Sequence, residues 1–363
     1  MATIRSLHLI GSRQFGGAEN FLLRLVQALA KLDDHHPEAA IRPQSPLREP
    51  LAEAGIPLHF VPLRNGWDIP SVFKVRRLVR ETDAQIVQTY MGRGTRLTRL
   101  PKRSEAVHVA RLGGFYKIDG YYRHAHAWVG NTRGLCDYLV REGLPAGRVF
   151  HISNFVPMPR TSSEEELAGL RQQLDIPEDA LVLFTLGRFI EIKGFDDLLR
   201  AFAKMPSEVD GRPVLLMIGG DGPLRENLLS LAEELRIAAR VRWPGWLKDP
   251  ARFFHAANLF VCPSRVETLG NVILEGWAHG LPVVSTDTPG GKELIVEGGN
   301  GLLAPRENPG RLAAVCTDLL RQGDSILAKL ASAGHDTLLR KHTEEAVVAG
   351  YQEMYRQLLQ GRR

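Results

Sequence analysis

Residues 181–194 read LVLFTLGRFIEIKG, and this stretch decides the fold of the second half of the chain. Its first six residues are aliphatic, aromatic or β-branched, which is typical of a strand buried in a parallel sheet, and Gly187 ends the run. Arg188 and Lys193 follow, before a helix expected near 194–204. The guanidinium group of Arg188 and the ammonium group of Lys193, beside the start of a helix, would suit binding of a diphosphate. The alternative is that both are surface residues without a function.

The same alternation of short apolar runs and amphipathic segments occurs in both halves of the chain, which is typical of β-α-β units. A Pro- and Ser-containing segment at 154–163 is the best candidate for a linker, and 344–360 carries one apolar helical stripe. We therefore predict an α/β chain with two doubly wound, Rossmann-like domains and a ligand site at the carboxyl ends of their strands. The expected strands are 4–10, 56–62, 84–90, 106–110, 126–130, 181–187, 214–220, 258–262 and 281–285, and a further helix is expected at 20–32.

The composition of the 363 residues, 44% hydrophobic and 24% charged, is that of a soluble globular protein and excludes disordered and coiled-coil classes. No apolar run is long enough to span a bilayer, and Arg5 and His8 interrupt the N-terminal apolar stretch, so a signal peptide is not expected. Three widely spaced cysteines without metal-ligand spacing favour a reducing compartment. The sequence therefore predicts a cytoplasmic location.

Positive charge is concentrated in the first half of the chain. Residues 1–157 hold 22 Lys and Arg against 13 Asp and Glu, and 64–123 alone hold 13 against 5. Such a surplus favours an anionic partner, either an acidic membrane surface or an anionic acceptor, although a solvated basic face is the simpler reading. No motif for nucleic-acid recognition accompanies it. Arg93, Arg96, Arg99, Lys102 and Arg103 fall within eleven residues, and if the segment is helical, residues 96, 99, 100 and 103 share a face that could meet an anionic membrane.

A glycine loop, GSRQFGGAE at 11–19, follows the first expected strand. It lacks the lysine of a phosphate-binding loop and the spacing of a dinucleotide-binding loop. What remains is a backbone that could approach a ligand closely at the start of a helix, or a glycine turn that only begins the helix.

The stretch ETLGNVILE at 267–275 places two carboxylates eight residues apart across the start of a helix. Val272, Ile273 and Leu274 make that turn apolar, so Glu275 needs partners, for which sugar hydroxyls are natural donors. The backbone amides of 269–271 would point at an anion at the helix start. A helix-capping role is the alternative for Glu267.

Taken together, these motifs resemble those of retaining glycosyltransferases of the GT4 type. The resemblance covers nearly the whole chain, through the Gly-Gly-Ala-Glu loop, Gly187-Arg188, Lys193-Gly194, Gly220-Asp-Gly222-Pro223, Gly245-Trp246, Pro263-Ser264 and Glu267-x7-Glu275. It implies a GT-B fold of two Rossmann-like domains facing a central cleft, with a nucleotide-sugar donor and no required metal. The implied parts are an acceptor-binding domain at 1–157, a donor-binding domain at 158–343 and a helix at 344–363 that packs back on the first domain.

The resemblance also implies a role for each matching residue. Arg188 and Lys193 would neutralise the leaving diphosphate, Glu267 would contact the donor sugar, and Glu275 would bind the ribose hydroxyls. Fixed positive charge at the departing oxygens would be the main catalytic contribution. The remaining donor contacts would come from the backbone amides of Thr268, Leu269, Gly270 and Asn271, from Gly245 and Trp246 beside the base, and from Gly16 and Gly17 across the cleft.

One departure from the family concerns a histidine that many relatives carry after a strand of the first domain. Here Arg111-Leu-Gly113 is expected to occupy that loop, and His108 is expected inside the strand. His124 and His126 are read as structural in the same way. The leaving phosphate is thought to take the acceptor proton in such enzymes, so no histidine is expected to be essential.

The sequence thus predicts a retaining, metal-independent glycosyltransferase without a cofactor. The expected donor is a UDP-sugar, and the acceptor a saccharide or glycolipid of a bacterial envelope glycan of the lipopolysaccharide type, reached at the inner face of the cytoplasmic membrane. A nucleotide-sugar epimerase and a non-catalytic nucleotide-sugar-binding module remain alternatives. A glycogen or starch synthase fits less well, because those relatives carry a lysine in the first glycine loop.

Overall fold

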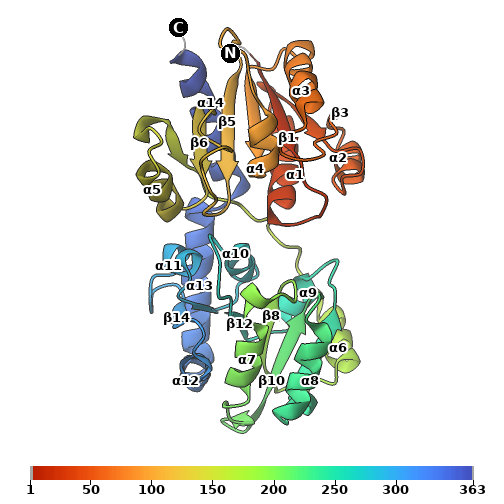
Figure 1. The fold of residues 1–363 in the computed structure, drawn as a ribbon. Helices are drawn as coiled ribbons and strands as arrows, with labels where there is room; N and C mark the ends of the chain where they lie inside the picture. The colour runs from red at the N-terminus through yellow and green to blue at the C-terminus, as the bar shows by residue number, and fades with distance from the viewer. Residues whose placement is uncertain (1–2, 362–363) are drawn as a thin grey trace. The chain divides into compact units, whose positions relative to one another are not determined.

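The computed structural model describes residues 3–361, which divide into two compact units, each with its own sheet (Figure 1). The first unit runs to Phe155 and resumes at Glu344, and the second is Val156–Thr343. The division falls before the boundary expected at 157/158, because Phe155 packs in the core of the first unit and Val156 in that of the second. The outermost limits expected for the domains, residues 1 and 363, lie outside the described residues.

The sheet of the first unit has seven strands in the order β3-β2-β1-β4-β5-β6-β7, and every neighbouring pair is parallel. The order reverses beside β1, which lies between β2 and β4. The strands are β1 (Ile4–Ile10), β2 (His35–Ile41), β3 (Leu58–Phe60), β4 (Ile86–Tyr90), β5 (Val107–Leu112), β6 (Ala127–Gly130) and β7 (Val149–His151). The helices are α1 (Gly17–Ala30), α2 (Arg48–Glu53), α3 (Ile69–Glu81), α4 (Met91–Leu97), α5 (Arg133–Arg141), η1 (Ala146–Arg148) and α14 (Glu344–Gln360).

The second sheet repeats this topology in the order β11-β10-β8-β12-β13-β14, with the reversal between β8 and β12 and a short antiparallel β9 beside β10. The strands are β8 (Leu181–Leu186), β9 (Glu208–Val209), β10 (Arg212–Gly219), β11 (Val241–Gly245), β12 (Leu259–Cys262), β13 (Val283–Thr286) and β14 (Leu302–Ala304). The helices are α6 (Glu164–Gln173), η2 (Glu191–Lys193), α7 (Phe195–Phe202), α8 (Arg225–Glu234), η3 (Ala238–Arg240), α9 (Ala251–His255), α10 (Asn271–Ala278), α11 (Pro289–Leu294), α12 (Pro309–Arg321) and α13 (Asp324–Lys341).

The last helix, α14, packs in the core of the first unit through its apolar stripe. Tyr351 and Tyr355 are fully buried there, and the Tyr355 hydroxyl donates a 2.7 Å hydrogen bond to Gln88 on β4. Arg356 forms a 2.9 Å ion pair with Asp34 near the start of β2. The chain therefore closes the hydrophobic core of its first unit with its final helix.

Two expectations for the first unit are wrong. The helical face through residues 96, 99, 100 and 103 does not form, because α4 ends at Leu97 and Pro101 disfavours helical backbone at the residue before it. The loop assigned to Arg111 and Leu112 is the end of strand β5, where both residues are buried. His108 lies within β5, as expected.

Candidate functional site

Two loops meet at the carboxyl ends of β8 and β12, where the strand order of the second sheet reverses. The first loop leads from β8 into η2 and α7 and carries Arg188 and Lys193. The second leads from β12 into α10 and carries Glu267. In doubly wound sheets this reversal point leaves a crevice between the diverging connections, which is where ligands bind.

The Lys193 ammonium group and the Glu267 carboxylate form an ion pair that joins these two loops. The side chains are partly buried, with 24% of the lysine and 14% of the glutamate exposed, and the Ser264 hydroxyl donates a 3.0 Å hydrogen bond to the same carboxylate oxygen. Burial acts against the lysine charge, but the carboxylates of Glu267 and Glu275 outweigh it and raise the pKa of Lys193. The structure thus brings Lys193 and Glu267 of the predicted site together around a retained positive charge, with Glu275 close enough to act on it electrostatically.

Close backbone contact fixes the position of the β8–α7 loop against the β12–α10 loop. Gly194, directly after Lys193, has a φ of +63°, and a Cβ atom there would lie 2.2 Å from the carbonyl oxygen of Pro263. The backbone N–H of Arg265 also donates a 2.9 Å hydrogen bond to the carbonyl of Ile192. A larger residue at 194 would force the loops apart, so the glycine is what allows Lys193 to reach Glu267.

The start of α10 presents unused backbone donors beside this pair. Gly270 precedes the helix with a left-handed φ of +85°. Among residues 3–361, the backbone N–H groups of Thr268, Leu269 and Gly270 donate no hydrogen bond. Free amides at the positive end of a helix form a binding site for an anion, as the sequence predicts for this turn.

Arg188 and Trp246 lie farther along the same edge of the sheet. Their neighbours are joined to the intervening strand by backbone hydrogen bonds, from Gly187 to the Gly219 carbonyl (3.1 Å) and from Gly220 to the Gly245 carbonyl (2.8 Å). Arg188 is exposed, and 72% of Trp246 is exposed beyond the end of β11. Both side chains are therefore exposed to solvent at this edge. Gly16 and Gly17 belong to the first unit, where Gly17 begins α1.

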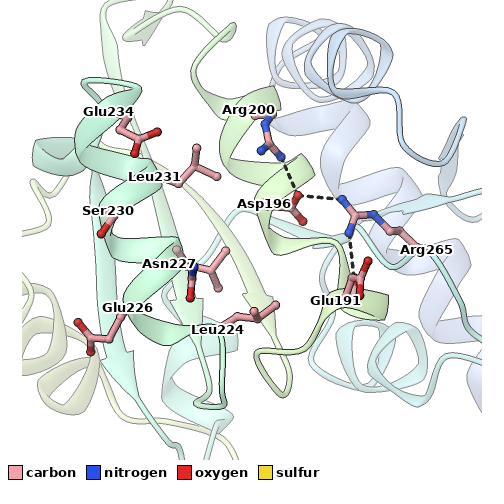
Figure 2. A pocket seen from close by; sticks show the side chains of 11 residues that line it. Glu191, Asp196, Arg200, Leu224, Glu226, Asn227, Ser230, Leu231, Glu234 and Arg265 are labelled. Carbon is pink, nitrogen blue, oxygen red and sulfur yellow. Dashed lines mark hydrogen bonds and ion pairs between the residues drawn. The ribbon is translucent and has the colours of Figure 1, made fainter.

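Sequence reasoning missed Arg265, whose side chain also joins the two loops (Figure 2). Its guanidinium group donates 2.8 Å hydrogen bonds to both Asp196 and Asp197 at the start of α7, and a 3.1 Å bond to the carbonyl of Glu191. These carboxylates raise the pKa of Arg265 against the effect of burial. The only signal in the sequence is an arginine directly after Pro263-Ser264, which does not reveal partners about 70 residues away in the chain.

A pocket of about 560 Å³ lies between α7 and α8, and Arg265 and Asp196 form part of its wall (Figure 2). Leu224 and Leu231 line it together with the carboxylates of Glu226 and Glu234. None of the predicted donor-site residues is part of its wall. The pocket is therefore separate from the Lys193–Glu267 pair.

Two histidines of the first unit, His108 and His124, are held by hydrogen bonds within the fold. His108 is 1% exposed, and its Nε2 lies 2.9 Å from the hydroxyl of Thr89, while burial and nearby cationic groups hold its pKa well below the usual range. The Nε2 of His124 lies 2.8 Å from the carbonyl oxygen of Thr95, and burial lowers the pKa of His124 to about 4. Both rings are therefore neutral at physiological pH.

We expect His108→Ala, His124→Ala and His126→Ala each to keep at least about one tenth of the wild-type kcat, because none of these rings is placed as a general base. Steady-state kinetics would be measured on variants whose thermal unfolding shows that they are folded. A fall of about 10²–10⁴-fold in a folded variant would identify that histidine as a catalytic acid or base.

The amino-acid sequence is similar to those of known glycosyltransferases. The family model described as glycosyl transferases group 1 matches residues 168–335. A relative from Rhizobium meliloti, described as lipopolysaccharide core biosynthesis glycosyltransferase LpsE, is 34% identical over 341 residues. That alignment covers 93% of this chain and 95% of the relative.

Solved structures share the fold over nearly the whole chain. A glycosyltransferase from Rickettsia africae superposes with a TM-score of 0.86 at 18% identity, covering 98% of this chain and 99% of the other. The Anabaena protein HepE, solved in complex with UDP-glucose, superposes with a TM-score of 0.82 at 21% identity, again covering 98% and 99%. At these identities the likeness shows the fold.

Proposed function

The chain belongs to the family of glycosyl transferases group 1 and has the GT-B fold, and from this premise we propose a specific activity for it. The enzyme transfers a sugar, with retention, from a UDP-sugar to a saccharide or glycolipid acceptor of the lipopolysaccharide core. The observation that supports this proposal is the Lys193–Glu267 pair, together with the unused amides of residues 268–270 before α10, at the reversal point of the second sheet. The acceptor class rests on the likeness to LpsE.

In this proposal the diphosphate of the donor binds between Lys193, Arg188 and the amides that begin α10. As the bond to the sugar breaks, negative charge grows on the departing phosphate, and preoriented cations and N–H donors stabilise it. The two side-chain cations supply the charge that a metal ion provides in other transferases. Glu267 contacts the sugar and Glu275 the ribose, and the departing phosphate oxygen accepts the acceptor proton.

Thermal unfolding in the presence of a panel of nucleotide sugars tests the donor, beginning with UDP-glucose. A donor at 100 times its Kd should add about 2.7 kcal/mol to the free energy of unfolding. Product analysis with the stabilising donor then separates transfer to an acceptor from epimerisation. If no nucleotide sugar stabilises the chain, the proposal is wrong, and stabilisation without turnover on any envelope saccharide would leave a binding module.

We also propose that the enzyme works at an anionic membrane surface, through an exposed apolar patch that we define as Trp67, Ile69 and Phe73. These side chains are 78%, 65% and 62% exposed. Ile69 and Phe73 lie on α3, which also exposes Lys74 and Arg77, and Trp67 lies just before that helix. Apolar side chains beside cations suit the headgroup region of an anionic bilayer, where each charge contributes about 1 kcal/mol. Within residues 3–361, no helix has the length and apolar character to span a membrane.

Sedimentation with vesicles tests this surface. We expect Trp67→Ser and Phe73→Ser each to weaken binding to anionic vesicles by about tenfold, the equivalent of about 1.4 kcal/mol for one lost apolar contact. Leu339→Ser, which removes a 46% exposed side chain on α13, is the matched control and should bind like the wild type. Sedimentation of both patch variants at the wild-type level would contradict the assignment.

A further inference from the structure

Three arginines gather where the strand order of the first sheet reverses. Arg13 follows β1, Arg42 follows β2 and Arg93 lies just after β4, and these strands are neighbours in the sheet. All three therefore stand at the carboxyl edge of the sheet, at the position where doubly wound domains bind ligands. We refer to them as the arginine cluster.

Arg42 is buried and forms no ion pair among the described residues, and the Asp68 carboxylate acts on it only through a longer-range attraction. The residue is 8% exposed, and its Nη1 donates a 2.6 Å hydrogen bond to the carbonyl of Leu63. Among residues 3–361 the Arg42 side chain makes no other hydrogen bond and no ion pair. A guanidinium group has five N–H donors, so most of them remain for a ligand. Among the described residues, no guanidinium nitrogen of Arg42 is both buried and without a hydrogen bond, so its unused N–H groups are accessible to a ligand.

Arg93 donates a hydrogen bond to the same carbonyl oxygen as Arg42. Its Nη1 donates to the carbonyl oxygen of Leu63 (3.3 Å) and to that of Gly11 (3.1 Å), so two guanidinium groups share one acceptor. Leu63 presents this carbonyl from a left-handed backbone with a φ of +43°, a strained conformation for a leucine. The Ser71 hydroxyl accepts a 2.9 Å hydrogen bond from the Leu63 N–H and fixes the loop. Strained backbone of this kind is concentrated at ligand sites.

The electrostatics of the cluster favour an added anion. Burial and the positive charges of Arg13 and Arg93 lower the pKa of Arg42, while the buried carboxylate of Asp68 opposes them only in part. Asp68 is itself engaged by the Arg64 backbone and the Ser71 hydroxyl. A bound anion would relieve the repulsion among the three guanidinium groups.

We propose that the arginine cluster binds the anionic group, a phosphate ester or a carboxylate, of the saccharide acceptor. This inference rests on the proposed function, which supplies the saccharide. Arg–phosphate and Arg–carboxylate pairs can both be bidentate, so the geometry fits either source. Phe15 and Met91, two residues from Arg13 and Arg93, are 48% and 38% exposed and offer an apolar surface for a sugar ring.

The test is direct binding to the full-length protein, measured by calorimetry with glucose, glucose 6-phosphate and glucuronate as probes. We expect one or both charged sugars to bind and uncharged glucose to bind at least tenfold more weakly. Preferential binding of glucose 6-phosphate would identify a phosphate site, and preferential binding of glucuronate a carboxylate site. Arg13→Gln should weaken binding of the charged sugar by about tenfold or more, since one hydrogen bond to a charged group contributes about 1.5–3 kcal/mol.

Arg13 is exposed and no hydrogen bond holds its side chain among the described residues, so Arg13→Gln should fold even if Arg42→Gln does not. Arg80→Gln, which removes an exposed arginine from α3, is the matched control and should bind the charged sugar like the wild type. Lys193→Ala should also bind it normally, because Lys193 belongs to the second unit. Loss of binding in Lys193→Ala but not in Arg13→Gln would overturn the proposal, as would equal affinity for charged and uncharged sugars.

This outcome is independent of the donor assay. If nucleotide sugars fail to bind while Arg13→Gln loses the charged sugar, the proposed function fails and the anion site stands. If nucleotide sugars bind and the charged sugars bind to Arg13→Gln as to the wild type, the anion site fails and the proposed function stands.

Discussion

Replacing Lys193 with alanine is expected to lower kcat by at least about 100-fold, the usual cost of losing one charge-stabilising contact at a departing oxygen. The ammonium group is held at the reversal point of the second sheet, where the structure retains its charge. Arg188→Ala should give a loss of similar size. Both variants should also bind free UDP more weakly, because the diphosphate loses a cation in the ground state as well.

The partial burial of Lys193 calls for a control on folding. Removing the lysine leaves the Glu267 carboxylate without its ion pair, which by itself destabilises the loops. Lys193→Ala/Glu267→Ala should recover thermal stability without recovering turnover, because the double variant removes the unpaired charge but restores no cation. Lys204→Ala, an exposed lysine just beyond α7, should be unchanged in both respects. Wild-type kcat in Lys193→Ala and Arg188→Ala would rule out the donor site.

Replacing Glu267 and Glu275 with alanine, one at a time, is expected to change different kinetic parameters. Glu275→Ala should chiefly raise the donor KM and weaken binding of free UDP, because a contact to the ribose is equally strong in the ground state and the transition state. Glu267→Ala should lower kcat by about 100-fold while free UDP still binds, because its proposed contact is to the sugar.

Calorimetry with UDP and steady-state kinetics with the intact donor separate the two roles. Ser264→Ala is an informative companion, since it removes one hydrogen bond to Glu267 and leaves the carboxylate in place. Its kcat should lie between those of the wild type and Glu267→Ala. Weakened UDP binding in Glu267→Ala together with a low kcat in Glu275→Ala would mean that the two roles are exchanged.

The sequence predicted a strand or helix correctly where the pattern of apolar residues or glycines within that one segment is characteristic of the element. The apolar run at β8 predicts that strand because a buried parallel strand needs apolar side chains on both faces. The stripe of α14 predicts its buried face for a similar reason. Gly270 before Asn271 predicts the start of α10, where the left-handed backbone favours glycine.

The same pattern did not predict strands that are stabilised mainly by pairing with neighbouring strands. Strand β2 begins His-His-Pro-Glu and has no continuous apolar run, yet it lies between β1 and β3. Pro37 is tolerated because β3 pairs only with Ala39–Ile41, which leaves the proline where β2 has a single neighbouring strand. Strand β11 contains Arg242, Trp243 and Pro244 and pairs only with β10 at the edge of its sheet.

The sequence by itself determined the two doubly wound domains and the residue types at the strand ends, because periodicity and glycine positions are local properties. Only the tertiary structure decided which of those residues meet. Lys193 and Glu267 lie 74 residues apart, and Arg42 and Arg93 share the carbonyl of Leu63 across three segments. The order of the strands sets these pairs, since it brings distant loops to the same edge of a sheet, and no local pattern records that order.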